Sequence, residues 1–229
     1  MEFICGDIHQ EILKLETDSI DMIYTNPPFG ITKKKWDKSL DWDTLFPEMD
    51  RVLKSTGSAV IHTSIPFTYT LIAHRKPRYH YTWMKENSTN FFSAKRQPLR
   101  ILEEILIYNT HRIDGSSVVN GVYNPQMTGT MVTHSALKSA DNDGYYGGGG
   151  KNRPEPHTGK YPTTFLGKFK RVKKGGKSTP KEIVEQMILS YTEPGQKVLD
   201  MTHHNQYVGE ICVKLGRTYL GIDVAPEFY

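Results

Sequence analysis

Four consecutive residues, Asn26, Pro27, Pro28 and Phe29, place an amide, two rigid residues and an aromatic ring directly after an apolar run. That run, residues 20–25, has the composition of a buried strand. Proline fixes φ and lacks the N–H that a sheet ladder needs, so the two prolines end the strand and stiffen the chain beyond it. Amide oxygens and aromatic rings bind ligands by hydrogen bonding and stacking. Taken alone, the pattern predicts a rigid exit from a strand.

Three aspartates, Asp7, Asp200 and Asp223, also lie at or just beyond the ends of strand-like segments. Ligands of open α/β sheets bind outside the carboxyl ends of the strands. We therefore expect these aspartates and Asn26 to converge at the carboxyl ends of adjacent strands. Each aspartate alone is equally well explained as a helix cap or a turn residue.

The elements that must position these residues alternate along the chain. Seven segments have the composition of strands: 2–5, 20–25, 58–62, 79–85, 103–108, 197–199 and 218–222. A helix is predicted over 43–54, ended by Gly57, and a second over 179–191. In the second, Thr179 is the expected cap, Pro180 the first helical residue and Glu182 the partner in a capping box. Strands that alternate with helices indicate an α/β fold around a mostly parallel sheet.

Residues 110–176 break this alternation. They contain the run NDGYYGGGGKNRPEP and many Gly, Asn, Thr and Pro residues, with few apolar clusters. A stretch of this length without clear elements inside a domain is usually functional or mobile. The whole chain has 229 residues, of which 37% are hydrophobic, which is enough for one sizeable core. We therefore predict one α/β domain with a long insertion.

Positive charge is concentrated in and beside the end of this insertion. The net charge is +4, yet ten Lys or Arg residues and one Glu lie between Lys151 and Lys181. The stretch GKFKRVKKGGK gathers basic residues beside glycines and an aromatic ring, as is typical of contacts to a phosphate backbone. A solvated charged loop is the alternative. The residues that this pattern offers for contact with a nucleic acid, the candidate DNA-binding residues once the resemblance given below is considered, are Lys168, Lys170, Arg171, Lys173 and Lys174.

Several other classes of protein are not supported by the sequence. No apolar run approaches the ~18 residues of a membrane span, and the N-terminal residues lack a signal-peptide pattern, so we expect a cytoplasmic protein. Cys5 and Cys212 lie in apolar patterns and are predicted to be reduced core residues. The neighbouring His203 and His204 have no Cys or carboxylate cluster around them, so no metal site is predicted.

Four blocks of the sequence, in one order, resemble the β-group of amino-directed DNA methyltransferases, especially short phage and mobile-element members. The blocks are ICGDIHQEILKLETDSIDMIYTNPPFGITKKKWDK, FFSAKRQPLRILEEILIYN followed by YNPQMTG, KSTPKEIVEQMILSYTEPGQKVLD, and GRTYLGIDVAPEFY. The resemblance implies a Rossmann-like, seven-stranded, mostly parallel sheet of the class I methyltransferase type. It also implies a division into a catalytic half at 1–109, a target-recognition insertion at 110–176 and a cofactor-binding half at 177–229.

The resemblance assigns roles to the residues introduced above. Oδ1 of Asn26 and the carbonyl of Pro27 would accept the two hydrogens of an exocyclic amino group, Pro28 would help to hold that carbonyl, and Phe29 would stack on a base flipped out of double-stranded DNA. Adenine N6 is favoured over cytosine N4 by analogy, because N-P-P-F recurs among adenine enzymes. The methyl donor implied is S-adenosylmethionine, and its candidate binding residues are Asp7, Thr179, Asp200, Thr202 and Asp223.

This chain departs from the family pattern directly after Asp200. The pattern P-F-x-G-S-G-T-T-G aligns with residues 201–209, so that its first two glycines fall on His204 and Gln206. Glycine permits positive φ and leaves room, so side chains at both positions are expected to crowd the methionine end of the cofactor. Three alternatives stay open: an active methyltransferase, a catalytically impaired DNA-binding relative, and a non-catalytic subunit that needs a catalytic partner. A homodimer is a further open arrangement.

Overall fold

The computed structural model describes all residues except 90, 110–120, 133–156, 171–178, 205 and 225–229. The chain divides into two compact units. The first combines Met1–Asn124 with Thr164–Tyr229, and the second is Pro125–Thr163. Three of the candidate DNA-binding residues, Arg171, Lys173 and Lys174, lie outside the described residues.

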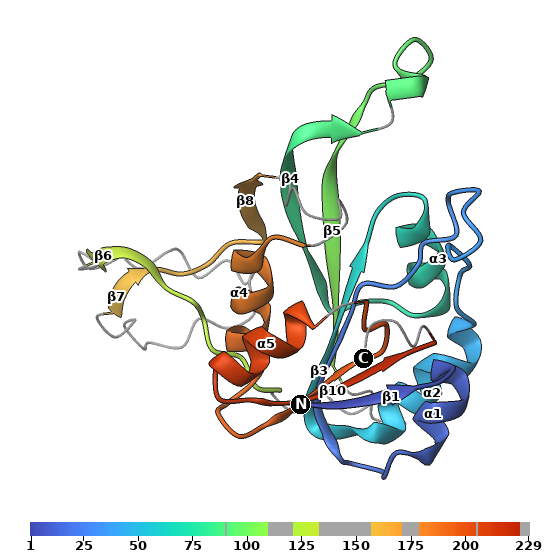
Figure 1. Ribbon diagram of the computed structural model, residues 1–229. Helices are drawn as coiled ribbons and strands as arrows, with labels where there is room; N and C mark the ends of the chain where they lie inside the picture. Colours follow the sequence, from blue (N-terminus) through green and yellow to red (C-terminus); the bar gives the residue numbers. More distant parts are fainter. Residues whose placement is uncertain (90, 110–120, 133–156, 171–178, 205, 225–229) are drawn as a thin grey trace, which may run out of the picture. The chain divides into compact units, whose positions relative to one another are not determined.

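The first unit is built on one eight-stranded sheet with the order β1-β10-β9-β2-β3-β5-β4-β8 (Figure 1). Neighbouring strands run parallel except that β5 is antiparallel to both β3 and β4. The strands are β1 Glu2–Cys5, β2 Ile20–Thr25, β3 Leu53–Thr63, β4 Tyr79–Thr89, β5 Arg100–Asn109, β8 Phe165–Phe169, β9 Lys197–Asp200 and β10 Thr218–Asp223. The predicted α/β fold with a mostly parallel sheet is confirmed. The sheet has eight strands rather than seven because β8 adds to its edge.

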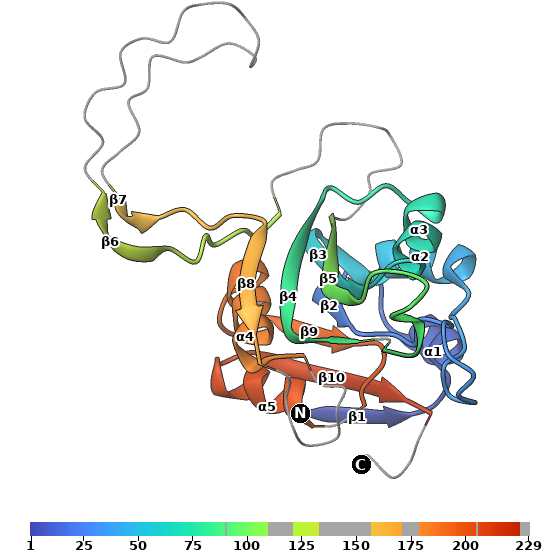
Figure 2. The same ribbon diagram turned by 90° about the horizontal axis from the view of Figure 1, so that it is seen from above.

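Helices cover both faces of this sheet (Figure 2). One core packs against α1, α2 and α3, and the other against α4 and α5. The bounds are α1 Ile8–Glu11, α2 Trp42–Val52, α3 Phe67–His74, α4 Lys181–Tyr191 and α5 Tyr207–Lys214, with short 3-10 helices η1 Ile12–Lys14 and η2 Phe91–Ser93. Because both faces are covered, β2 is buried at every position, which explains its continuous apolar sequence.

The predicted starts and ends of the two helices were partly wrong. The helix predicted over 43–54 corresponds to α2, which ends at Val52. Gly57 does not end this helix but lies within β3. The pairing of β2 with β3 is irregular between Ile20 and Met22, and a Cβ at Gly57 would lie 2.9 Å from the carbonyl oxygen of Lys54. Glycine is therefore suited to position 57 because the strand is irregular there and the neighbouring backbone leaves no room for a side chain.

The predicted capping box before α4 was also wrong. Pro180 is the N-cap residue rather than the first helical residue, and no side chain caps this helix. Thr179 has a different task, because its hydroxyl accepts a hydrogen bond from Asn26. The prediction for the cysteines was half right: Cys212 is buried, whereas Cys5 is exposed because it ends the edge strand β1.

The second unit contains two antiparallel strands, β6 Thr128–Val132 and β7 His157–Lys160. The sequence did not predict these strands, since they are short and lie in a polar, glycine-rich stretch. Among the described residues, no helix is long and apolar enough to cross a membrane.

Candidate active site

The four residues expected to converge do so at the carboxyl ends of four neighbouring strands. β1, β10, β9 and β2 are adjacent and parallel, and Asp7, Asp223, Asp200 and Asn26 lie at or just beyond their carboxyl ends. The register pairs Cys5 with Asp223, and Asp200 with both Gly221 and Tyr24. The predicted convergence is confirmed.

Asn26 is exposed at the end of the fully buried strand β2, while Pro27 behind it is buried. Nδ2 of Asn26 lies 3.5 Å from Oγ1 of Thr179, the residue before the cap of α4. Within the part of the chain that the structure describes, Oδ1 of Asn26 accepts no side-chain or backbone hydrogen bond. Next to it, the hydroxyls of Thr25 and Thr202 are 2.8 Å apart and connect β2 with the end of β9. The amide oxygen of Asn26 is therefore left as a hydrogen-bond acceptor at the carboxyl end of β2.

Phe29 is half-buried and supported from behind by another ring. It stacks on Phe67 of α3, with ring centroids 5.1 Å apart and an interplanar angle of 19°. Phe67 in turn packs against Trp42, which is buried at the start of α2. One face of Phe29 is thus covered by Phe67, while the side chain as a whole is only partly buried.

Asp37 closes the segment that follows Phe29, and the sequence reasoning missed it. Its carboxylate is buried and accepts hydrogen bonds from the backbone N–H groups of Gly30 at 2.8 Å and Thr32 at 2.7 Å. Burial alone would raise the pKa of Asp37, but the hydrogen bonds from Thr32 and Gly30 outweigh it and lower the pKa below the usual 3.8. Gly30 has a φ of +67°, so the chain turns sharply there and needs this support.

The side chain of Asp200, the last residue of β9, is buried rather than exposed to solvent. Oδ1 accepts from the N–H of Thr202 at 3.1 Å, and Oδ2 accepts from the hydroxyl of Tyr219 at 3.0 Å. That hydroxyl also lies 2.8 Å from Nδ1 of His203, which is fully buried. Burial, with a smaller contribution from the charge of Asp223, raises the pKa of Asp200 to about 7. These contacts hold the first residues after β9 in place.

Asp7 is the N-cap residue of α1, in keeping with the simple capping explanation. Oδ1 accepts from the backbone N–H of His9 and contacts Nδ1 of the same ring, both at 2.8 Å. Two hydrogen bonds from His9 lower the pKa of Asp7. The bond from the side chain has the larger effect, and the bond from the backbone N–H adds to it. The side chain is nevertheless half-exposed, so it remains open to a ligand at the edge.

His204 and Gln206, which replace the two family glycines, are both exposed. Among the described non-glycine residues, only Asp18 has a positive φ, so neither position uses a conformation that requires glycine. His203 takes the buried position instead. Its ring packs on Phe3 with centroids 4.7 Å apart, and its Cγ lies 2.9 Å from where a Cβ on Gly221 would be. The backbone at these two positions therefore gives no support to the expected crowding of a cofactor.

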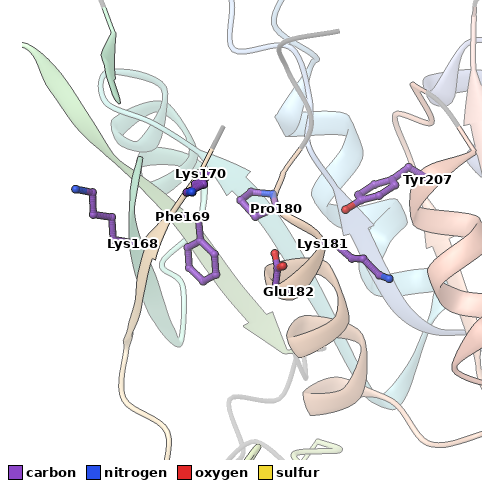
Figure 3. Close-up of a pocket in the computed structure, with 7 residues that line it drawn as sticks. All are labelled: Lys168, Phe169, Lys170, Pro180, Lys181, Glu182 and Tyr207. Carbon is purple, nitrogen blue, oxygen red and sulfur yellow. The ribbon is translucent and has the colours of Figure 1, made fainter. Parts of the chain in front are cut away.

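A cavity of about 480 Å³ opens between β8, the start of α4 and the start of α5 (Figure 3). This volume lies within the range of small-molecule sites. Its lining residues are Lys168, Phe169, Lys170, Pro180, Lys181, Glu182 and Tyr207. Pro180 follows Thr179 directly, so the cavity adjoins the residue that contacts Asn26. Elsewhere, the described residues contain no group of three His, Cys, Asp or Glu side chains that could hold a metal ion.

Comparison with known proteins identifies the family. A family model described as DNA methylase, of the N6/N4 methyltransferase type, matches residues 20–229. The chain belongs to this DNA methylase family. It is 25% identical over 253 aligned residues to the DNA adenine methyltransferase YhdJ of Escherichia coli K12, covering 98% of this chain and 79% of that protein.

Two solved methyltransferases share the fold of this DNA methylase. The complex of M1.HpyAVI with SAM has a TM-score of 0.62 and 16% sequence identity, covering 99% of this chain and 95% of that one. The cytosine-N4-specific PvuII DNA methyltransferase has a TM-score of 0.66 and 13% identity, covering 99% and 82%. These structures show the shared fold, and the family match identifies the chain as a DNA methyltransferase of the N6-adenine or N4-cytosine type, which acts on DNA.

The structure adds four residues to the candidate site of this DNA methylase: Phe67, Asp37, Tyr219 and His203. The first two support the segment after Asn26, and the last two support Asp200. Only His203 carried a local signal, as the neighbour of His204 in the altered pattern. The others act through contacts that no short motif encodes.

Proposed function

We propose that this DNA methylase transfers a methyl group from S-adenosylmethionine to the exocyclic amino nitrogen of a flipped base, adenine N6 in preference to cytosine N4. The observation that carries the proposal is the exposed amide of Asn26 at the end of a buried strand, beside Thr179, Thr202 and the acids of the neighbouring strands. The name of YhdJ, a DNA adenine methyltransferase, supports adenine as the target. Because the PvuII enzyme is specific for cytosine N4, the experiment below must also detect methylated cytosine.

The exocyclic amino group of a base is a poor nucleophile because its lone pair is delocalised into the ring. Oδ1 of Asn26 and the carbonyl of Pro27 accept its two hydrogens, which favours a tetrahedral nitrogen whose lone pair points at the methyl donor. Both acceptors are fixed before the base arrives, because Pro27 is buried and the Asn26 amide contacts Thr179. Phe29, backed by Phe67, provides the stacking surface for the extruded base.

The residues present fit the polar ends of S-adenosylmethionine. Asp223 and the half-exposed Asp7 lie at neighbouring strand ends, where they would hold the ribose hydroxyls and the adenine amino group. In the cavity, Glu182 offers a carboxylate for an ammonium group, and Lys181 offers a partner for a carboxylate. When bound, the cofactor supplies an electrophilic methyl group on a sulfonium. Between the adenosine end and the methionine end of the cofactor, the site would be formed by Thr179, Thr202 and Asp200.

Lys168 and Lys170 are exposed at the end of β8, and we assign them to the phosphates of the DNA together with Arg171, Lys173 and Lys174. On the proposed division, residues 1–109 carry the catalytic residues, 110–176 the target recognition and 177–229 the cofactor contacts. The expected consequence is DNA binding that weakens steeply with salt.

A second candidate function follows from His204 and Gln206. Loss of both family glycines is what a DNA-binding relative without cofactor affinity, or a non-catalytic subunit, would show. Two observations favour the enzyme: both side chains are exposed, and neither backbone position needs glycine. A homodimer or a catalytic partner subunit is tested by the same measurements on the purified chain and on mixtures.

The deciding experiment uses tritium-labelled S-adenosylmethionine and unmethylated genomic DNA. After transfer, the DNA is digested to nucleosides, and mass spectrometry separates N6-methyladenine from N4-methylcytosine. We expect N6-methyladenine, a loss of about 100-fold or more in Asn26→Ala, and retained activity in Asn26→Asp, since a carboxylate also accepts. DNA binding by the unaltered chain without any methyl transfer or cofactor binding would establish the second candidate instead.

A further inference from the structure

The strands β4 and β5 continue beyond the sheet as a two-stranded arm (Figure 1). We define the arm as residues 85–89 of β4, a tip made of η2 and residues 94–99, and residues 100–103 of β5. β3 ends at Thr63, which pairs with Glu104, so the arm has no neighbour from β3. β4 runs parallel to β8 and in the same direction as β2. The arm therefore projects from the same side of the sheet as Asn26, the side formed by the carboxyl ends of β2 and β4.

The reach of the arm follows from the register. Thr25 pairs with Ile61 and Ile61 with Leu106, so Asn26 is level with Ile105. At ~3.3 Å per residue, Arg100 stands roughly 17 Å beyond that level. The tip therefore projects far enough to enter a groove of a duplex that lies across this side of the sheet, and the major groove of DNA admits a two-stranded ribbon.

The tip presents two aromatic rings to solvent. Phe91 is 66% exposed and Phe92 is 105% exposed, the highest value among the exposed large hydrophobic residues. Lys95 and Arg96 follow within the same turn and are also exposed. No acidic residue occurs from 91 to 102. Aromatic rings combined with positive charge fit a nucleic acid better than an apolar protein surface.

The arm is braced, so the rings are held in place rather than trailing. Lys85 and Glu103 form an ion pair across it at 2.8 Å, and Nη1 of Arg100 donates to the carbonyl of Ile65 at 2.7 Å. At the tip, the N–H of Ala94 donates to the carbonyl of Phe91 at 3.0 Å, and those of Arg96 and Gln97 donate to Ser93. Binding through pre-ordered rings loses less conformational entropy.

The base of the arm is flanked by the basic end of β8. The register pairs Met84 with Lys168 and Lys85 with Phe169, and Lys170 follows directly. Positive charge thus continues from the arm towards the cavity, as a phosphate backbone crossing both would require.

From these observations we infer that the arm is a DNA wedge: Phe91 and Phe92 insert into the base stack beside the extruded nucleotide, while Lys95 and Arg96 hold the adjacent phosphates. Apolar side chains that enter between base steps hold the duplex open in this way. The inference rests on the proposed function, because a wedge serves an enzyme that flips its target base.

The test needs no knowledge of the recognition sequence. A wedge prefers a duplex that already contains a gap, so binding is compared between one intact duplex and the same duplex with a single abasic site. We expect the unaltered chain to prefer the abasic duplex by roughly ten-fold, as one or two stacked rings provide. Phe91→Ala with Phe92→Ala should abolish the preference.

Two further variants separate the roles. Lys95→Gln with Arg96→Gln should weaken binding to both duplexes equally and reduce the salt slope by about two. Leu13→Ala with Val213→Ala, which removes two exposed apolar side chains away from the arm, should change nothing. Melting temperatures confirm that all variants fold.

Each other outcome overturns the inference. Equal binding to the two duplexes by the unaltered chain, or a preference that survives in the double Phe variant, excludes a wedge. If sedimentation shows that the double Phe variant only converts a dimer to a monomer, the tip is a protein interface. Binding of S-adenosylmethionine, measured separately, shows whether the proposed function stands when the wedge fails.

Discussion

The side-chain amide of Asn26 lies 3.5 Å from the hydroxyl of Thr179, although 153 residues separate the two in the chain. The contact joins the end of β2 to the start of α4, and Pro180 beyond it lines the cavity. It also orients the amide so that Nδ2 faces the protein and Oδ1 is left as the acceptor. Thr179 is therefore placed to influence the reaction through Asn26, in addition to its proposed role towards the cofactor.

Thr179→Val tests this positioning role. Loss of one orienting hydrogen bond should lower kcat about five-fold, since such a bond contributes on the order of 1 kcal/mol. Thr179→Ser keeps the hydroxyl and should retain activity. In the double variant with Asn26→Ala, the threonine change should have no further effect. A rise in the Kd for S-adenosylmethionine with kcat unchanged would assign Thr179 to cofactor binding alone.

Asp37→Asn should loosen the segment after Phe29. The amide cannot accept from both N–H groups as the carboxylate does, so we expect a loss of roughly 1–3 kcal/mol in the free energy of unfolding at pH 7 and reduced methyl transfer. Because the folded pKa of Asp37 is lowered below 3.8, its contribution is present above that value and is lost as pH falls through the folded pKa. The difference between the two proteins should therefore shrink in acid.

Chemical denaturation at several pH values measures this difference. Glu16→Gln, at an exposed acid on the surface, serves as the control and should show a much smaller change. An unaltered stability of Asp37→Asn at pH 7 contradicts the proposed support of the segment.

The sequence predicted the strands best where burial is complete. β2 begins and ends at the predicted residues because both faces of the sheet are covered and the two prolines stop it. β8 was missed because its FLGKF sequence is half exposed at a sheet edge, and α1 because four residues are too few to show helical periodicity.

For the site, the sequence placed the ends of strands but not the contacts between them. The convergence of Asp7, Asn26, Asp200 and Asp223 was predicted because ligands of open α/β sheets bind outside the carboxyl ends of the strands, and the observed strand order agrees. The burial of Asp200 under Tyr219 and His203 did not, because it depends on tertiary packing between residues whose types are common in any core. Similarly, nothing near Asp37 in the sequence specifies its backbone partners.

Asp200 is expected to make the free energy of unfolding depend on pH between its ordinary pKa of 3.8 and its folded pKa of about 7. Its folded pKa of about 7 lies above the usual 3.8, so the folded state retains a proton that the unfolded chain releases. The stabilisation is complete below 3.8 and is lost as pH rises towards 7, by up to ~4 kcal/mol. Asp200→Asn should flatten the pH dependence of the unfolding free energy over this range. Glu16→Gln, at an exposed acid, should leave it unchanged; an identical slope in Asp200→Asn and the unaltered chain would contradict the assignment.

The last prediction concerns His204 and Gln206. The sequence alone favoured a clash with the cofactor, relieved by returning both positions to glycine. Since both side chains are exposed and both φ values are negative, we now expect the unaltered chain to bind S-adenosylmethionine, and His204→Gly with Gln206→Gly to change its Kd by less than about three-fold. His203→Ala is the contrasting variant, because it removes buried packing on Phe3 and Gly221 and should lower the melting temperature. Calorimetric titration of all three proteins decides the matter. A gain of ten-fold or more in the glycine variant restores the crowding explanation, whereas no binding by either form means that the protein acts on DNA without its own cofactor.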